Sequence, residues 1–173
     1  MPRNEELTEL MVRYQQGDPR AVTSLVETLS PQLHRFFNAQ FVSRRYADDL
    51  LQETWLRIHQ VRHTYRPREP VLPWIYAIAR HTRVDHYRKT RRVEDREQQV
   101  DVLPERPASP APESRGPDLD AMLRELPESQ REVVLMLKVA EMSIEEVARA
   151  TSSSAGSVKQ KAHRAYEKLR GLV

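Results

Sequence analysis

Basic and aromatic side chains alternate between Arg62 and Arg92, and this mixture is the strongest chemical signal in the chain. The stretch holds nine Arg and Lys residues against two carboxylates, Glu69 and Asp85. Cations neutralise the phosphates of a nucleic acid, and aromatic rings stack on unpaired bases. The stretch therefore predicts a surface for unpaired nucleic acid. Trp74 is assigned to the core, whereas exposed rings are expected at Tyr65, Tyr76, His81 and Tyr87.

Two adjacent carboxylates, Asp48 and Asp49, precede this stretch. Leu51, Trp55 and Ile58 follow at positions i, i+4 and i+7, which places them on one face of a helix. We expect Asp48 and Asp49 in the first turn of that helix, where the helix dipole favours negative charge. Because neighbouring side chains on a helix point about 100° apart, a protein-binding surface suits this pair better than a catalytic dyad.

Two histidine pairs are the candidates for a metal site. His59 and His63 stand four residues apart, and His81 and His86 flank Asp85. A metal site needs a third converging ligand, and the chain has no cysteine and no His-Glu-x-x-His motif. It also has no Gly-rich phosphate loop and no Gly-x-Ser-x-Gly elbow. We therefore predict no catalytic residue, no metal and no cofactor.

A second nucleic-acid signal lies at the end of the chain. Ser143 and Glu146 form a capping box that begins a short helix, and the polar residues 151–154 then interrupt it. The last helix carries an apolar stripe of Val158, Ala162, Ala165 and Leu169. This order of elements is typical of a helix-turn-helix. Its candidate DNA contacts are Gly156, Ser157, Lys159, Gln160, His163 and Arg164. The alternative is a basic helix face that only meets solvent.

The elements that position these groups are expected to be helices. Only four glycines are present, charged residues make up 31% of the chain, and five of the twelve prolines lie between 104 and 117. That composition argues against a β-sandwich or a Rossmann domain. We predict an all-α fold with two small helical domains, residues 1–92 and 118–173, and a flexible Pro-rich linker at 93–117.

Proline and glycine mark the expected helix boundaries in the first domain. Gly17 ends the first helix, and Asp18-Pro19 supplies a capping carboxylate and a first-turn proline for the next. Ser30-Pro31 repeats this pattern and is expected to begin another helix. The basic helix is expected to begin at about Pro73.

The chain is expected to be soluble and cytoplasmic. The absence of cysteine is compatible with a reducing compartment. The first residues lack the apolar core of a signal peptide, and no apolar run approaches the length that spans a membrane, so no membrane insertion is predicted.

Three motifs, in this order, resemble those of a bacterial sigma factor of the extracytoplasmic-function type, and the resemblance spans nearly the whole chain. Asp48-Asp49-Leu50-Leu51-Gln52-Glu53-Thr54-Trp55 resembles the family's polymerase-binding helix. Trp74 to Arg80, followed by Asp85-His86-Tyr87-Arg88, resembles the segment that opens and recognises the minus-ten promoter element. Leu126 to Val133, Ser143 to Ala148 and Gly156 to Ala165 resemble the minus-thirty-five module.

The resemblance implies roles and partners. The partners would be core RNA polymerase, through its largest-subunit clamp and its flap, then promoter DNA and an anti-sigma factor. Polymerase-binding residues would be Asp48, Asp49, Gln52 and Glu53. The loop from Tyr65 to Val71 would capture a flipped base, and the linker would run toward the RNA exit path. The implied minus-ten contacts are Tyr65, Arg66, Arg68, Tyr76, Arg80, His81, Arg83, Tyr87, Arg88 and Lys89.

The chain departs from the family pattern at three places. His81 stands where the family often has Asn, so the minus-ten preference does not carry over. The turn at Thr151-Ser152-Ser153 is more polar than usual. Pro70 and Pro73 bracket the base-capturing loop.

Two other classes of protein are alternatives. A stand-alone helix-turn-helix repressor or activator would bind duplex DNA without polymerase, as a dimer on a palindrome, but the chain offers no dimerisation heptad. A metal-dependent helical enzyme would use His59, His63, His81 and His86.

Overall fold

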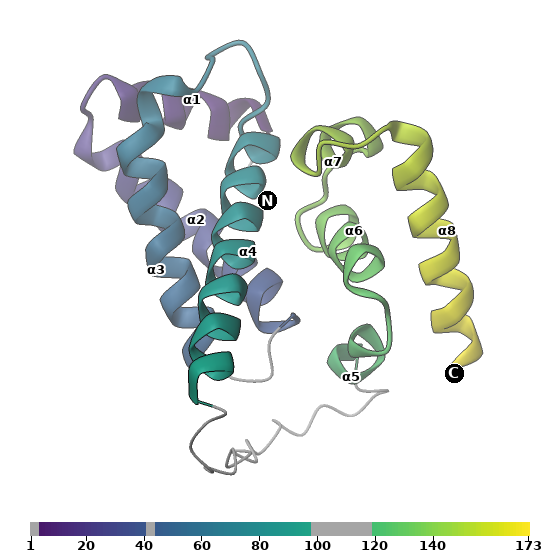
Figure 1. Cartoon of the computed structure of the whole chain (residues 1–173). Helices are drawn as coiled ribbons and strands as arrows, with labels where there is room; N and C mark the ends of the chain where they lie inside the picture. The colour runs from purple at the N-terminus through teal and green to yellow at the C-terminus, as the bar shows by residue number, and fades with distance from the viewer. Residues whose placement is uncertain (1–3, 41–43, 98–118) are drawn as a thin grey trace.

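The computed structural model describes residues 4–40, 44–97 and 119–173 (Figure 1). These residues form helices and short turns without a strand, which confirms the expected all-α class. The N-terminal unit comprises α1 (Asn4–Gln15), α2 (Pro19–Asn38), α3 (Arg44–Val61), the 3-10 turn η1 (Arg62–Thr64) and α4 (Val71–Glu97). The C-terminal unit comprises α5 (Leu119–Arg124), α6 (Glu128–Lys138), α7 (Ile144–Ala150) and α8 (Ala155–Gly171). Most of the expected linker, residues 98–117, lies outside the described residues.

The core of the N-terminal unit forms around one face of α2. Leu25, Leu29, Leu33 and Phe36 recur at helical spacing and are fully buried. Helices α1 and α3 pack against α2, and α4 packs against α3. The ring of Phe36 meets the ring of Tyr76 from α4 edge to face, with centroids 5.3 Å apart. This packing fixes the first turns of α4 against the core.

The predicted caps are present. Asp18 precedes Pro19 and accepts a hydrogen bond from the Arg20 amide at 2.9 Å. Ser143 and Glu146 form both bonds of the capping box that begins α7. Ser154 accepts from the Ser157 amide at 3.1 Å and begins α8. Local polar signals therefore set the start of three helices.

The prediction that Ser30-Pro31 begins a new helix is wrong. Helix α2 runs unbroken from Pro19 to Asn38 with Pro31 inside it. An interior proline costs about 3 kcal/mol, whereas each large apolar side chain that α2 buries contributes about 1.5–3 kcal/mol. The buried face continues through Leu29 and Leu33 on both sides of the proline, so tertiary packing outweighs the local signal. Ser30 does not cap; its Oγ accepts the indole N–H of Trp55 at 2.9 Å.

Two further boundaries differ from expectation. Helix α3 begins at Arg44, so Asp48 and Asp49 lie in its second turn and not in its first. Helix α4 begins at Val71, where Pro73 falls in the first turn and its missing amide leaves no intrahelical bond unmade. At its other end α4 continues to Glu97, so residues 93–97, assigned to the linker, are helical.

The C-terminal unit has the expected helix-turn-helix arrangement. Helix α7 packs against α8, and both pack against α6. Val158, Ala162 and Ala165 of α8 are buried, as the stripe predicts, and Leu169 is partly buried against the same core. Ser152 in the turn adopts a positive φ of 51°. The polar turn therefore reverses the chain by a left-handed residue that is not glycine.

The two units touch each other. Helix α4 packs against α7, and α2 against α6 (Figure 1). The buried apolar side chains form one cluster that includes residues of both units. At the edge of this contact the Asn4 amide donates a 2.6 Å hydrogen bond to Glu146 of the α7 capping box.

Candidate functional site

The acidic face of α3 is open to solvent. Asp48, Asp49, Gln52 and Glu53 are all exposed, and their spacing places them along one side of the helix. His34 of α2 lies 2.8 Å from Asp48, whose carboxylate stays 68% exposed. This face carries negative charge that a partner can reach.

Leu56 extends the same surface and was not singled out from the sequence. Its side chain is 52% exposed, one turn beyond Gln52 and Glu53. Leu56 does not lie on the face of α3 that carries the buried residues. An apolar residue at such a position could have been recognised from the sequence. A charged face with an apolar residue at its end is typical of a protein-binding surface.

Arg57 connects this acidic face to α4. Its guanidinium donates to Glu53 at 3.0 Å and to Asp85 at 2.7 Å. The hydrogen bond from Arg57 lowers the pKa of Asp85, and the same bond raises the pKa of Arg57. Asp85, one of two carboxylates in the basic stretch, is thus paired with Arg57 of α3. Its negative charge therefore neutralises the neighbouring cations of α4 less.

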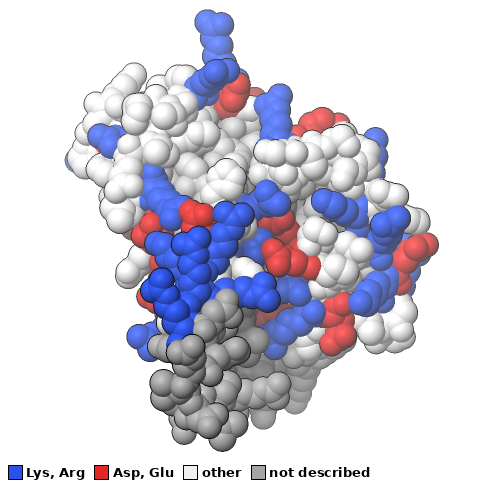
Figure 2. Space-filling view, in the orientation of Figure 1, with Lys and Arg blue, Asp and Glu red and all other residues white. Residues whose placement is uncertain are grey.

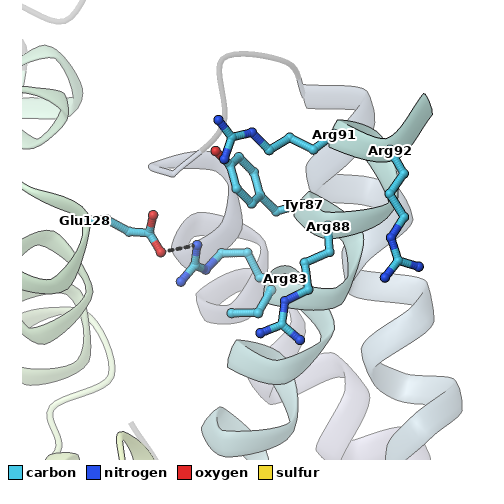
Figure 3. Close-up of a pocket in the computed structure, with 7 residues that line it drawn as sticks. Arg83, Tyr87, Arg88, Arg91, Arg92 and Glu128 are labelled. Atoms are coloured by element: carbon cyan, nitrogen blue, oxygen red, sulfur yellow. Dashed lines mark ion pairs between the residues drawn. The ribbon is translucent and has the colours of Figure 1, made fainter. Parts of the chain in front are cut away.

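The basic surface lies on the second half of α4. Figure 2 shows Lys and Arg side chains gathered over this part of the molecule, with acidic side chains beside them. His81, Tyr87, Arg88 and Lys89 are exposed as expected. The Arg91 guanidinium lies over the Tyr87 ring, 5.5 Å from its centroid, and covers one face of that ring (Figure 3).

Two of the tyrosines expected to be exposed are buried. The Tyr65 ring is 3% exposed and packs at 5.4 Å from Trp74, while its hydroxyl donates to the Glu69 carbonyl. Tyr76 is 1% exposed beside Phe36. Both rings shape the loop and the core, and the predicted exposure of these two rings is wrong. Arg66 and Arg68 remain exposed on the loop.

Arg80 and Arg83 are held by the C-terminal unit. Arg80 Nε lies 3.0 Å from both carboxylate oxygens of Glu132. Arg83 lies 2.7 Å from Glu128 (Figure 3). It also lies 3.4 Å from Glu132. The side chains of Arg83 and Glu132 are only 6% and 4% exposed. In this conformation the Arg83 guanidinium is held by carboxylates, and the sequence contained no sign of these two glutamate partners.

The outer face of α8 is free for a ligand. Lys159, Gln160, His163 and Arg164 are exposed, and His163 lies 3.2 Å from Glu167 on the same helix. Gly156 is exposed at the first turn. The Ser157 amide is used by the Ser154 cap and so does not point freely at solvent. The face therefore offers side-chain donors together with the start of a helix. In DNA-binding proteins this combination contacts base edges and phosphates.

One histidine of each pair contacts a tyrosine: His59 meets Tyr14, and His86 meets Tyr46. His59 Nδ1 lies 2.6 Å from the Tyr14 hydroxyl, and the two rings stack at 5.9 Å. Within residues 4–40, 44–97 and 119–173, no three metal-ligating side chains converge. None of the helices formed by these residues is long and apolar enough to cross a bilayer.

Two protein families match the chain, one for each unit. Residues 25–93 match Sigma-70 region 2, which includes the acidic face of α3 and most of α4. Residues 118–169 match Sigma-70, region 4, which includes α5 to α7 and most of α8.

Characterised relatives span nearly the whole chain. It is 33% identical to the RNA polymerase sigma factor CarQ of Myxococcus xanthus, over 94% of this chain and 95% of CarQ. It is 32% identical to the ECF RNA polymerase sigma factor SigF of Caulobacter vibrioides, over 94% of this chain and 91% of SigF.

Two solved structures have a similar fold. CnrH in complex with the cytosolic domain of CnrY superposes with a TM-score of 0.73 at 22% identity, over 96% of each chain. RpoE of Bartonella quintana, in complex with the anti-sigma factor NepR, superposes with a TM-score of 0.72 at 21% identity. That alignment covers 87% of this chain and 95% of RpoE.

Proposed function

The chain belongs to the sigma-70 family and is a sigma factor of the extracytoplasmic-function type, and we propose that it directs core RNA polymerase to promoters through three separate surfaces. It contributes recognition and makes no bond itself, because the polymerase supplies the chemistry. It acts in the cytoplasm, where polymerase and promoter DNA are found.

Core polymerase binds the acidic face of α3. The support is the exposure of Asp48, Asp49, Gln52 and Glu53 together with Leu56 at the end of the same face. This is the single observation that carries the proposal. Charges at the rim of such a surface steer association, while the apolar residue supplies area that is removed from water. The expected partner surface on the clamp is therefore basic.

The minus-ten element binds along α4 and the preceding loop. Arg66, Arg68, Arg88 and Lys89 provide exposed cations for the phosphates, and His81 and Tyr87 provide exposed rings. Arg80 and Arg83 join them once the C-terminal unit has moved away. A base that leaves the stack must be unpaired at a cost, which a weak duplex lowers.

The minus-thirty-five element binds the outer face of α8. Lys159, Gln160 and Arg164 are exposed side chains on the second helix of a helix-turn-helix. Each of the two DNA-binding surfaces is modest. The polymerase would hold both at a defined separation, which raises the effective concentration of the second contact after the first has formed.

An anti-sigma factor is the proposed inhibitory partner. The similar RpoE structure contains one, and the surfaces described here are the ones that such a partner must cover in order to block polymerase or DNA. At 21% identity the resemblance supports the fold, so the partner itself is part of the proposal.

Reconstitution with bacterial core polymerase tests the function. Run-off transcription from promoter-containing genomic fragments is expected with the wild-type protein and not with Asp48→Arg/Asp49→Arg. The matched control is Glu5→Arg/Glu6→Arg, which reverses an equally exposed adjacent pair on α1. If the wild type neither binds core polymerase nor starts transcripts but retains duplex DNA alone, the repressor interpretation is correct.

A further inference from the structure

We infer that the C-terminal unit acts as an internal competitor for promoter DNA, because it occupies the arginines of α4 with its own carboxylates. This inference rests on the proposed function of α4. It concerns the free protein, in which the two units touch, and it assigns a regulatory role to Glu128 and Glu132 of α6.

Arg80 Nε donates to both carboxylate oxygens of Glu132 at 3.0 Å, a charge-assisted contact that arginine can also make with phosphate oxygens. Arg83 is shared between Glu128 at 2.7 Å and Glu132 at 3.4 Å. The carboxylates thus stand where the phosphate oxygens of a bound strand would have to stand. A strand must displace these carboxylates in order to contact the same guanidinium nitrogens.

Arg83 and Glu132 are almost fully removed from solvent, so their interaction is screened little by salt. Burial also leaves Arg83 Nε without a hydrogen-bond partner in the described part of the chain. The contact between Arg83 and the glutamates of α6 is therefore specific, but it leaves one buried N–H group of Arg83 without a hydrogen bond to any described residue. A ligand that offers several phosphates, and releases counterions when it binds, can displace it.

The contact between the two units covers only one side of the C-terminal unit. Helix α7 packs against α4, but the outer face of α8 remains exposed in the same conformation. The cations at the end of α4 also stay accessible: Arg88, Arg91 and Arg92 line a hollow whose carboxylate is Glu128 (Figure 3). Closure therefore engages Arg80 and Arg83, and leaves the end of α4 and the duplex-binding helix open.

Opening can be measured directly because the chain has no cysteine. Two introduced cysteines, Gln60→Cys on α3 and Gly171→Cys at the end of α8, accept a fluorophore pair. Gln60 is exposed, and a Cβ at Gly171 would meet no atom within 4 Å. In this background we would compare the unaltered carboxylates with Glu128→Gln/Glu132→Gln. The expected result is a longer inter-dye distance in the substituted protein, without polymerase present.

DNA affinity provides the second readout. The probe is a random-sequence single-stranded oligonucleotide, followed by fluorescence anisotropy. If closure leaves about one molecule in ten competent to bind, the apparent affinity is about tenfold weaker than that of the open form. Glu128→Gln/Glu132→Gln should therefore bind the strand about tenfold more tightly.

Two single variants guard against misfolding and against a simple charge effect. Glu128 is 61% exposed, so Glu128→Lys leaves no buried hole and should open the protein partially. Glu125→Lys makes the same charge change three residues away, where the described contact is a backbone carbonyl that accepts from Lys168. It should leave the inter-dye distance unchanged.

Unchanged distance in the double variant, or an opened protein that binds the strand no better, would overturn the inference. Neither result depends on polymerase. Conversely, a failed run-off assay with an open, DNA-binding variant would count against the proposed function and leave the closure intact.

Discussion

Arg57 of α3 donates a 2.7 Å hydrogen bond to Asp85 of α4, and the same guanidinium holds Glu53 at 3.0 Å. The residue therefore joins the proposed polymerase surface to the helix that carries the proposed DNA surface. A displacement of one helix at this point must be accommodated by the other.

Arg57→Gln should lower the free energy of unfolding by no more than about 1 kcal/mol, because Asp85 is 45% exposed and solvent screens the pair. Arg57 lowers the pKa of Asp85, so the stabilisation is present above the ordinary aspartate pKa and is lost as pH falls through the lowered value. Urea unfolding at neutral pH and below about pH 4 measures this. Arg45→Gln, exposed on the same helix, is the control and should show no such pH-dependent difference.

Tyr76→Phe should reduce the loss of stability at high pH. Burial raises the pKa of Tyr76, and its hydroxyl has no partner within the described residues. The folded state thus resists ionisation that the unfolded chain undergoes above about pH 10, which costs about 1.4 kcal/mol of stability for each further pH unit. Tyr14 and Tyr65, whose pKa values burial also raises, leave a residual decline.

The control for Tyr76 is Tyr87→Phe, because the Tyr87 ring is 49% exposed. Unfolding curves at neutral pH should show Tyr76→Phe at least as stable as the wild type, since an unsatisfied buried hydroxyl is removed. Equal alkaline profiles for Tyr76→Phe and the wild type would refute the explanation.

Pro31→Ala should stabilise the protein by about 1–3 kcal/mol, because it restores the missing amide in the middle of α2 and removes the ring from the preceding turn. Pro31 is exposed, so no buried volume is lost. Pro67→Ala in the loop before α4 should instead destabilise the protein by about 0.4–1 kcal/mol, because it only increases the conformational entropy of the unfolded chain. Thermal and urea unfolding of both variants, compared with the wild type, measure whether stability rises for Pro31→Ala and falls for Pro67→Ala.

Lys159→Gln should weaken duplex binding for every sequence alike and reduce the slope of log affinity against log salt by about 0.9, the contribution of one phosphate contact. Gln160→Ala should instead weaken binding by an amount that depends on the duplex sequence. Binding to several duplexes over a range of salt concentrations separates the two roles. Arg170→Gln removes the same charge at the far end of α8 and should leave the slope unchanged.

Local chemistry was sufficient to predict much of this fold. The capping residues Asp18, Ser143 and Ser154, and the stripe that includes Val158 and Ala162, depend on neighbours within one or two turns. Signals of that range are complete in the sequence. They were enough for the helix-turn-helix and for the all-α class.

The errors arose where distant residues decide. Pro31 remains helical because α2 buries apolar residues both before and after it in the sequence. Tyr76 is buried because Phe36 lies against it. The Arg80 partner, Glu132, is 52 residues away in the chain. No periodic pattern connects positions so far apart, so exposure of aromatic rings and the occupancy of the arginines could be established only in three dimensions.

The proposed sharing of Arg80 and Arg83 between α6 and DNA constrains how the chain can evolve. Each positive charge added near these arginines strengthens strand binding and also strengthens closure onto Glu128 and Glu132. Natural selection therefore cannot raise promoter affinity at these sites without also deepening the resting state, unless the glutamates change as well. Compensating substitutions in α4 and α6 are the expected record of that constraint.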